Sequence, residues 1–128
     1  MNVVDSSAWL EYFSGGIGAK HFASAIEAVH QLVVPSITLY EVYKRVREQR
    51  SEGEALVAVA AMEQGQVVDL TATIALQSAR LGVLHKLPLA DSVVLGTAQA
   101  VGATLWTQDA DFDGIANVRF FPKKPALR

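Results

Sequence analysis

Carboxylates dominate the chemistry that this sequence can support, and four of them hold comparable places: Asp5, Glu41, Asp91 and Asp109. Asp5 and Asp109 each follow a short apolar run of the kind that forms a buried strand. Glu41 and Asp91 each lie within the first two turns of a predicted helix. Because strand ends and the following helix starts meet at one edge of an open α/β sheet, we expect these four side chains to converge.

Carboxylates that converge without a basic partner repel one another, and the repulsion raises their pKa values. A bound divalent cation removes this repulsion, and an all-oxygen set of ligands suits Mg²⁺ or Mn²⁺ rather than Zn²⁺. Such an ion activates water and stabilises the charge on a phosphoryl group during in-line attack. Cysteine is absent, which excludes a thiolate metal site. The four acids therefore predict a Mg²⁺ or Mn²⁺ site suited to phosphoryl chemistry.

An alternation of apolar runs and amphipathic segments must position these acids. Short apolar runs predict strands at 2–5, 32–34, 66–70, 104–107 and 118–121. Helical periodicity predicts helices at 8–13, 20–31, from residue 36 onward, at 54–63, at 73–86 and from residue 88 to Gly102. Ser6 or Ser7 is expected to cap the first of these helices. This order of elements predicts an α/β fold with a mostly parallel sheet and helices on both of its faces.

Composition restricts the classes of protein that fit. The 128 residues are 51% hydrophobic and 19% charged, which is typical of one folded domain over residues 1–128. The net charge of −2 excludes a wholly basic nucleic-acid binder, so any RNA must be held by a local patch. No apolar run approaches the roughly 18 residues of a membrane span, and the N-terminus lacks the pattern of a signal peptide. We therefore expect a cytoplasmic protein without a membrane segment.

Four segments, taken in order, resemble a known family: VVDSSAWLEYF, ITLYEV, LPLADSVVLGTA and LWTQDADF. Together they resemble a PIN-domain ribonuclease and, within that family, the VapC-type toxins of type II toxin–antitoxin systems. The resemblance covers essentially the whole chain. It implies a PIN-like three-layer fold with a short five-stranded parallel sheet. It also implies a Mg²⁺- or Mn²⁺-dependent endoribonuclease, in which Mg²⁺-activated water hydrolyses RNA phosphodiester bonds.

The resemblance also implies the site residues and the partners. The acidic catalytic and metal-binding positions of the family map onto Asp5, Glu41, Asp91 and Asp109. Thr107 matches a hydroxyl position near the metal, and Asp111 matches an acid that only some members of the family have. A cognate VapB-like antitoxin, a homodimer and an RNA substrate, with transfer RNA as the expected class, are implied by the resemblance alone.

Basic residues lie close to two of the acids along the sequence. Lys44 and Arg45 begin a basic run one helical turn after Glu41, and Lys86 precedes Asp91. We expect these three cations to hold RNA phosphates at the rim of the site, where such contacts position RNA without reading its sequence.

Other interpretations of the acids are weaker. The segment from Asp109 to Gly114 imitates the start of an EF-hand calcium loop, but its twelfth position is Phe120 instead of the required Glu. A receiver domain would need an acidic pair at the end of the first strand, where only Asp5 is present. A non-catalytic PIN-like or receiver-like interaction module remains as the alternative, and the complete set of four acids argues against it.

Overall fold

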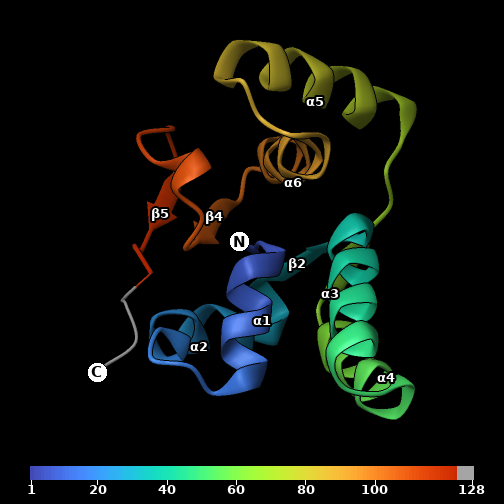
Figure 1. Ribbon diagram of the computed structural model, residues 1–128. Coiled ribbons are helices and arrows are strands. Elements are labelled where there is room, and N and C mark those ends of the chain that lie inside the picture. Colours follow the sequence, from blue (N-terminus) through green and yellow to red (C-terminus); the bar gives the residue numbers. More distant parts are fainter. Residues whose placement is uncertain (124–128) are drawn as a thin grey trace.

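The computed structural model describes residues 1–123, which form a central sheet with helices on both faces (Figure 1). Its five strands are β1 Asn2–Val4, β2 Leu32–Pro35, β3 Gln66–Val68, β4 Thr104–Thr107 and β5 Val118–Phe120. Its α-helices over these residues are α1 Ser6–Ser14, α2 Ala19–Glu27, α3 Ser36–Gln49, α4 Glu52–Met62, α5 Ala72–His85 and α6 Leu89–Ala100. Two 3-10 helices, η1 Val29–Gln31 and η2 Ala110–Phe112, complete the described chain.

All four strand pairings are parallel, in the order β3-β2-β1-β4-β5. Strand β1 is central, so the chain first builds the sheet outward through β2 and β3 and then returns to add β4 and β5 on the other side. The order of the strands therefore reverses between β1 and β4. In open parallel sheets, the crevice beyond the carboxyl ends of the strands at such a reversal is the usual binding site.

Alternation along the strands divides the core into two layers. Val4, Val34 and Trp106 belong to the cluster that packs against α1, α2, α3 and α4. Their neighbours Val33 and Leu105 belong to the cluster that packs against α5 and α6. Because successive side chains of a strand point to opposite faces, each short strand serves both layers. Figure 1 shows the sheet between these two groups of helices, as the three-layer prediction required.

The sequence predictions agree with this architecture, and all five strands lie where they were expected, with ends that differ by at most two residues. Helix α2 ends at Glu27, four residues earlier than predicted, and Val29–Gln31 form η1 instead. The prediction that Ser6 or Ser7 caps α1 was wrong. Asp5 caps this helix, because its carboxylate accepts a hydrogen bond from the backbone N–H of Ala8.

Helices α5 and α6 cross unusually closely because small residues face one another at the crossing. A Cβ added at Gly96 of α6 would overlap Ser78 Oγ of α5 and would lie 3.0 Å from Ser78 Cβ. A Cβ added at Gly82 of α5 would lie 3.3 Å from Ser92 Cβ of α6. This crossing fixes α6, the helix that carries Asp91, against α5. Over the described residues, no helix has the length and the apolar character needed to cross a membrane.

Candidate active site

Four elements bring the predicted acids to the edge of the sheet where the strand order reverses. Asp5 follows β1 directly, and Asp109 lies two residues after β4. Glu41 lies in the second turn of α3, which follows β2. Asp91 lies in the first turn of α6, whose start is set by Pro88. The carboxyl edge therefore receives acids from the first strand, the fourth strand and the two helices beside them.

Asp5 is the most deeply buried of these acids, with 3% of its surface exposed. Its Oδ1 accepts hydrogen bonds from Ala8 N at 3.1 Å and from Ser7 Oγ at 2.9 Å. Its Oδ2 accepts one from Thr107 Oγ1 at 2.8 Å. Burial nevertheless raises the pKa of Asp5 from 3.8 to about 6, because the loss of hydration outweighs these donors.

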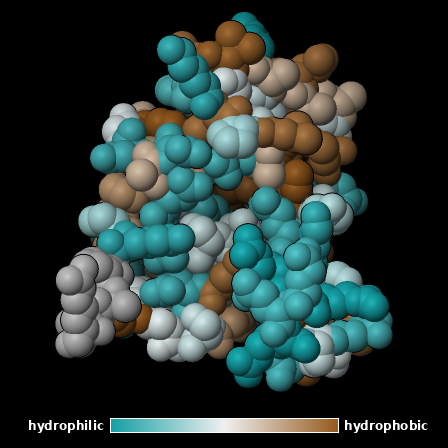
Figure 2. Space-filling view, viewed as in Figure 1, coloured by the Kyte–Doolittle hydropathy of each residue, from teal (hydrophilic) through white to brown (hydrophobic). Residues whose placement is uncertain are grey.

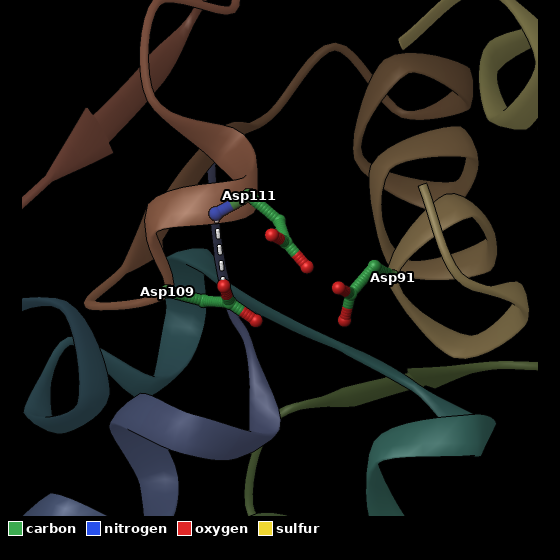
Figure 3. Close-up of side chains that lie close together, drawn as sticks. All are labelled: Asp91, Asp109 and Asp111. Atoms are coloured by element: carbon green, nitrogen blue, oxygen red, sulfur yellow. Dashed lines mark hydrogen bonds between the residues drawn. The ribbon is translucent and has the colours of Figure 1, made fainter. Parts of the chain in front are cut away.

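Asp91, Asp109 and Asp111 form a cluster in which one carboxylate oxygen from each lies within 4.8 Å of the other two. Figure 3 shows the three carboxylates directed toward one another, Asp91 from α6 and the other two from the loop after β4. The 3-10 turn η2 brings Asp111 into this group, since Asp109 Oδ1 accepts a hydrogen bond from Asp111 N at 2.9 Å. Helix α6 and the loop after β4 thus concentrate negative charge at one place.

The pKa of Asp91 shows that five acids act on the same space. It is raised from 3.8 to about 7, first by burial and then by the negative charges of Asp109, Asp5, Asp111 and Glu41. Each of the predicted acids, together with Asp111, is therefore close enough to repel Asp91. No Lys or Arg of the described residues forms a salt bridge with any of them, since the ion pair found there joins Arg50 and Glu54.

The five acids nevertheless fall into two groups with different surroundings. Asp91, Asp109 and Asp111 face one another, whereas Asp5 and Glu41 lie outside this 4.8 Å group and are held by hydroxyl groups. Ser6 Oγ donates a hydrogen bond to Glu41 Oε1 at 2.9 Å. The predicted quartet thus shares Asp91 and Asp109 with the observed cluster, and Asp111 completes that cluster.

Three hydroxyl groups support the acids. Thr107, expected near the site, donates to Asp5 through its Oγ1, and the same oxygen accepts a hydrogen bond from Asp109 N at 2.9 Å. Thr107 thereby connects the acid after β1 to the acid after β4. The contacts of Ser6 and Ser7 with the acids were not anticipated. Their position directly after Asp5 was the available signal, and it was interpreted as helix capping.

The three basic residues predicted at the rim differ in their surroundings. Lys44 is exposed, with its Nζ 5.8 Å from the centre of the Tyr40 ring. Arg45 lines a groove between α1, α3 and α4 instead of the acidic cluster. Lys86 is exposed at the end of α5, in a left-handed conformation with φ of 56°, a short loop before α6 and Asp91.

The acidic cluster fits a divalent cation. It offers only carboxylate oxygens, it lacks a cationic partner among the described residues, and burial together with its shared charge raises the pKa of Asp91. These are the ligands and the electrostatic conditions that favour Mg²⁺ or Mn²⁺ over Zn²⁺. Asp91, Asp109 and Asp111 would hold such an ion, with Asp5 and Glu41 close by.

Comparison with known proteins agrees with this geometry. The PIN domain family matches residues 3–118 of the chain. A chain of a toxin–antitoxin complex from Klebsiella pneumoniae is 28% identical, with a TM-score of 0.79 over 96% of this chain and 100% of that chain. VapC20 of Mycobacterium tuberculosis, a toxin that cleaves the sarcin–ricin loop, is 18% identical, with a TM-score of 0.76 over 98% and 100% of the two chains.

A chain of VapBC-1 from nontypeable Haemophilus influenzae is 17% identical, with a TM-score of 0.71 over 94% of this chain and 96% of that chain. At these last two identities, the likeness shows the fold alone. No curated protein sequence matches the chain.

Proposed function

This chain belongs to the PIN-domain family, and from that premise we propose that it is a cytoplasmic endoribonuclease that acts as the toxin of a toxin–antitoxin pair. The observation that carries the proposal is the cluster of Asp91, Asp109 and Asp111 at the reversal of strand order, with Asp5 and Glu41 beside it. The similarity to a chain of a toxin–antitoxin complex supports the toxin role.

The residues of the site would have different tasks in RNA hydrolysis. Asp91, Asp109 and Asp111 would hold Mg²⁺ or Mn²⁺, which supplies positive charge for the phosphoryl group and lowers the pKa of water. Asp5 is fixed by the hydroxyl groups of Ser7 and Thr107, so it presents a charge of constant position. Hydroxyl groups also hold Asp5 and Glu41 in place, and preorganised polar groups of this kind reduce the reorganisation that catalysis would otherwise require.

Two neighbouring acids of one loop provide the sharpest test. Asp111 belongs to the cluster, whereas Asp113 follows η2, is exposed and lies outside it. We expect Asp91→Asn and Asp111→Asn each to reduce Mg²⁺-dependent cleavage of labelled transfer RNA or total RNA by about a hundredfold or more. Asp5→Asn should also abolish cleavage, and Asp113→Asn should cleave at the wild-type rate.

Inactivity of the wild-type protein towards all RNAs, with Mg²⁺ or Mn²⁺, would instead support a non-catalytic interaction module. If Asp111→Asn cleaved RNA at the wild-type rate, as Asp113→Asn is expected to do, Asp111 would not belong to the site. The proposed rim cations Lys44, Arg45 and Lys86 would act on binding rather than on the chemical step, because phosphate contacts only position RNA.

A groove on the face of α1, α3 and α4 supports the proposal of an antitoxin partner. It has a volume of about 690 Å³, and its lining includes the apolar Leu10, Phe13 and Val57 together with the charged Arg45 and Glu54. Figure 2 shows hydrophobic surface in this hollow, bordered on one side by hydrophilic surface over α3. Trp9, on the same helix as Leu10 and Phe13, is only 1% exposed and belongs to the core instead of lining this groove.

A second apolar surface supports the proposed homodimer. Leu76, Val83 and Leu84 of α5 are 71%, 83% and 71% exposed, and Leu89 of α6 is 78% exposed. Their spacing puts the three residues of α5 along one side of that helix, and Figure 2 shows hydrophobic surface over α5. Large apolar patches of this kind mark interaction surfaces.

Two matched lysine substitutions test these two surfaces separately. Each replaces an exposed valine on a helix, one in the groove and one on α5. The proposed antitoxin would be sought as the product of a small gene next to the gene of this chain. Val57→Lys in the groove should abolish copurification with that product and leave the homodimer intact. Val83→Lys on α5 should yield a monomer in analytical ultracentrifugation and leave the partner bound. Expression of the chain alone should stop growth, and co-expression with the adjacent gene should restore it. Copurification that survives Val57→Lys would place the antitoxin elsewhere.

A further inference from the structure

A single hydrogen bond joins α1 to α3 beside the acidic cluster. Ser6, the first residue of α1, donates it through Oγ to Oε1 of Glu41 at 2.9 Å, although the two residues are 35 positions apart in the sequence. Both side chains are half-buried. Among the described residues, Ser6 is the one group that donates a hydrogen bond to the carboxylate of Glu41.

Ser6 is free for this contact because its neighbours carry out the capping of α1. Asp5 accepts the hydrogen bond from Ala8 N, and the hydroxyl of Ser7 donates to Asp5. The two adjacent serines therefore have separate tasks: Ser7 supports the acid that follows β1, and Ser6 supports the acid on α3. A helix cap alone would not explain the direction of the Ser6 side chain.

Glu41 needs such support because its carboxylate lies among like charges. After burial and the charges of the three other aspartates, its charge also helps to raise the pKa of Asp91, and no cation of the described residues pairs with it. A glutamate side chain has three rotatable bonds, so repulsion by the aspartates would turn an unsupported carboxylate toward solvent. The hydrogen bond to Oε1 opposes this movement and leaves Oε2 for another ligand.

We propose that Ser6 is a positioning residue, whose hydroxyl group holds Glu41 toward the acidic cluster and thereby strengthens the binding of a divalent cation. This inference rests on the proposed metal-dependent function. Outer groups that orient the ligands of a metal commonly change its affinity by ten- to a hundredfold, and this hydrogen bond is half-buried, so we expect the lower end of that range.

The test measures Mn²⁺ binding to the purified chain without RNA, from the electron paramagnetic resonance signal of the free ion. Ser6→Ala should weaken binding about tenfold. Ser6→Thr and Ser6→Val are a matched pair of similar shape, and only threonine keeps the hydroxyl group. Threonine should retain affinity within about twofold of wild type, and valine should lose as much as alanine. Ser24→Ala, on the exposed side of α2, is the control and should bind as wild type.

A Glu41→Ala background shows whether Ser6 acts through Glu41. There the further change Ser6→Ala should leave the affinity nearly unchanged, because the acceptor is gone. Equal affinities of the threonine and valine variants, or a full tenfold loss in the Glu41→Ala background, would overturn the positioning role. If wild type binds no Mn²⁺ at all, both the proposed function and this inference fail, which distinguishes that result from the failure of Ser6 alone.

Discussion

Helix α6 joins two regions of the molecule that are packed in opposite ways. Its first turn carries Asp91 to the acidic edge, where burial and, after it, neighbouring like charges raise the pKa of Asp91 to about 7. Its middle carries Gly96 to the crossing with α5, where even a Cβ would overlap Ser78 Oγ. At the acidic edge, like charges repel one another in a way that a bound cation would relieve. At the crossing, the side chains of α5 and α6 leave no space for another atom. Small substitutions should therefore change stability with opposite signs in the two regions.

The largest stability effect is expected at the crossing. Gly96→Ala should lower the free energy of unfolding by about 2–3 kcal/mol, because the new methyl group meets the side chain and backbone of Ser78. Gly53→Ala in α4 is the matched control, since its Cβ would lie 3.9 Å from the nearest atom, Ser51 Oγ. That variant should be stabilised by about 0.5 kcal/mol. Urea denaturation measures both, and equal effects would show that the crossing can relax.

Without divalent ions, the acidic edge should make the free energy of unfolding depend on pH. The pKa values of Asp5 and Asp91 are raised from 3.8 to about 6 and about 7 in the folded chain. From pH 3.8 up to the raised pKa of each group, the folded chain keeps protons that the unfolded chain has released. The free energy of unfolding must therefore fall as the pH rises through this range. Because Asp91 is only partly buried, we expect its contribution to be about 1–2 kcal/mol after allowance for solvent screening.

Urea denaturation in chelator between about pH 4 and pH 7 measures this slope. Asp91→Asn removes the group that titrates highest, so the decline of stability above about pH 6 should become shallower in that variant. Gly96→Ala should lower the whole curve and leave its slope unchanged, because the crossing contains no acid. A stability that rises through this range in the wild type would contradict the assignment of repulsion to the acidic edge.

Most substitutions destabilise a protein, but at neutral pH the same repulsion predicts that a substitution at Asp91 stabilises this one. Asp91→Asn should be more stable than wild type in chelator, by about 1 kcal/mol, because a neutral amide replaces a charge surrounded by four carboxylates. Mg²⁺ should raise the melting temperature of the wild type, since it binds only the folded site, and should raise that of the variant less. Equal Mg²⁺ shifts in thermal melts of the two proteins would exclude Asp91 from the cation site.

These two regions also show how far the sequence could be interpreted. The strands were predictable because short runs such as Thr104 to Thr107 are apolar on both sides, as a buried parallel strand requires. The position of Asp91 was predictable because Pro88 and an apolar helix fix the start of α6. The closeness of the α5–α6 crossing was not predictable, since Gly96 only becomes significant once Ser78 is known to face it.

The membership of the acidic cluster was predicted only in part. Whether Asp111 joins Asp109 depends on the single turn η2, and a turn of three residues leaves no periodic pattern in a sequence. The task of Ser6 depends on a contact with a helix 35 residues away. Asp5, Ser6 and Ser7 are all good capping residues, so local preference could not decide which of them caps α1.

The smallest expected effect concerns Lys86, which ends α5 and leads into the loop before Asp91. Although it belongs to the helix of the tight crossing, we propose that its charge serves the acidic edge by holding an RNA phosphate. Lys86→Gln keeps the length of the side chain, so stability should change by no more than about 0.5 kcal/mol. The affinity for RNA, measured in chelator to prevent metal-dependent cleavage, should fall modestly. The slope of log affinity against log salt concentration should decrease in magnitude by about 0.7–0.9 for one lost phosphate contact.

Arg80→Gln, at an exposed position two turns earlier on the same helix, is the control and should keep the wild-type slope. Fluorescence anisotropy of a labelled single-stranded RNA over a range of salt concentrations measures all three proteins. Equal slopes for Lys86→Gln and wild type would show that Lys86 contacts no RNA phosphate and serves only to end α5.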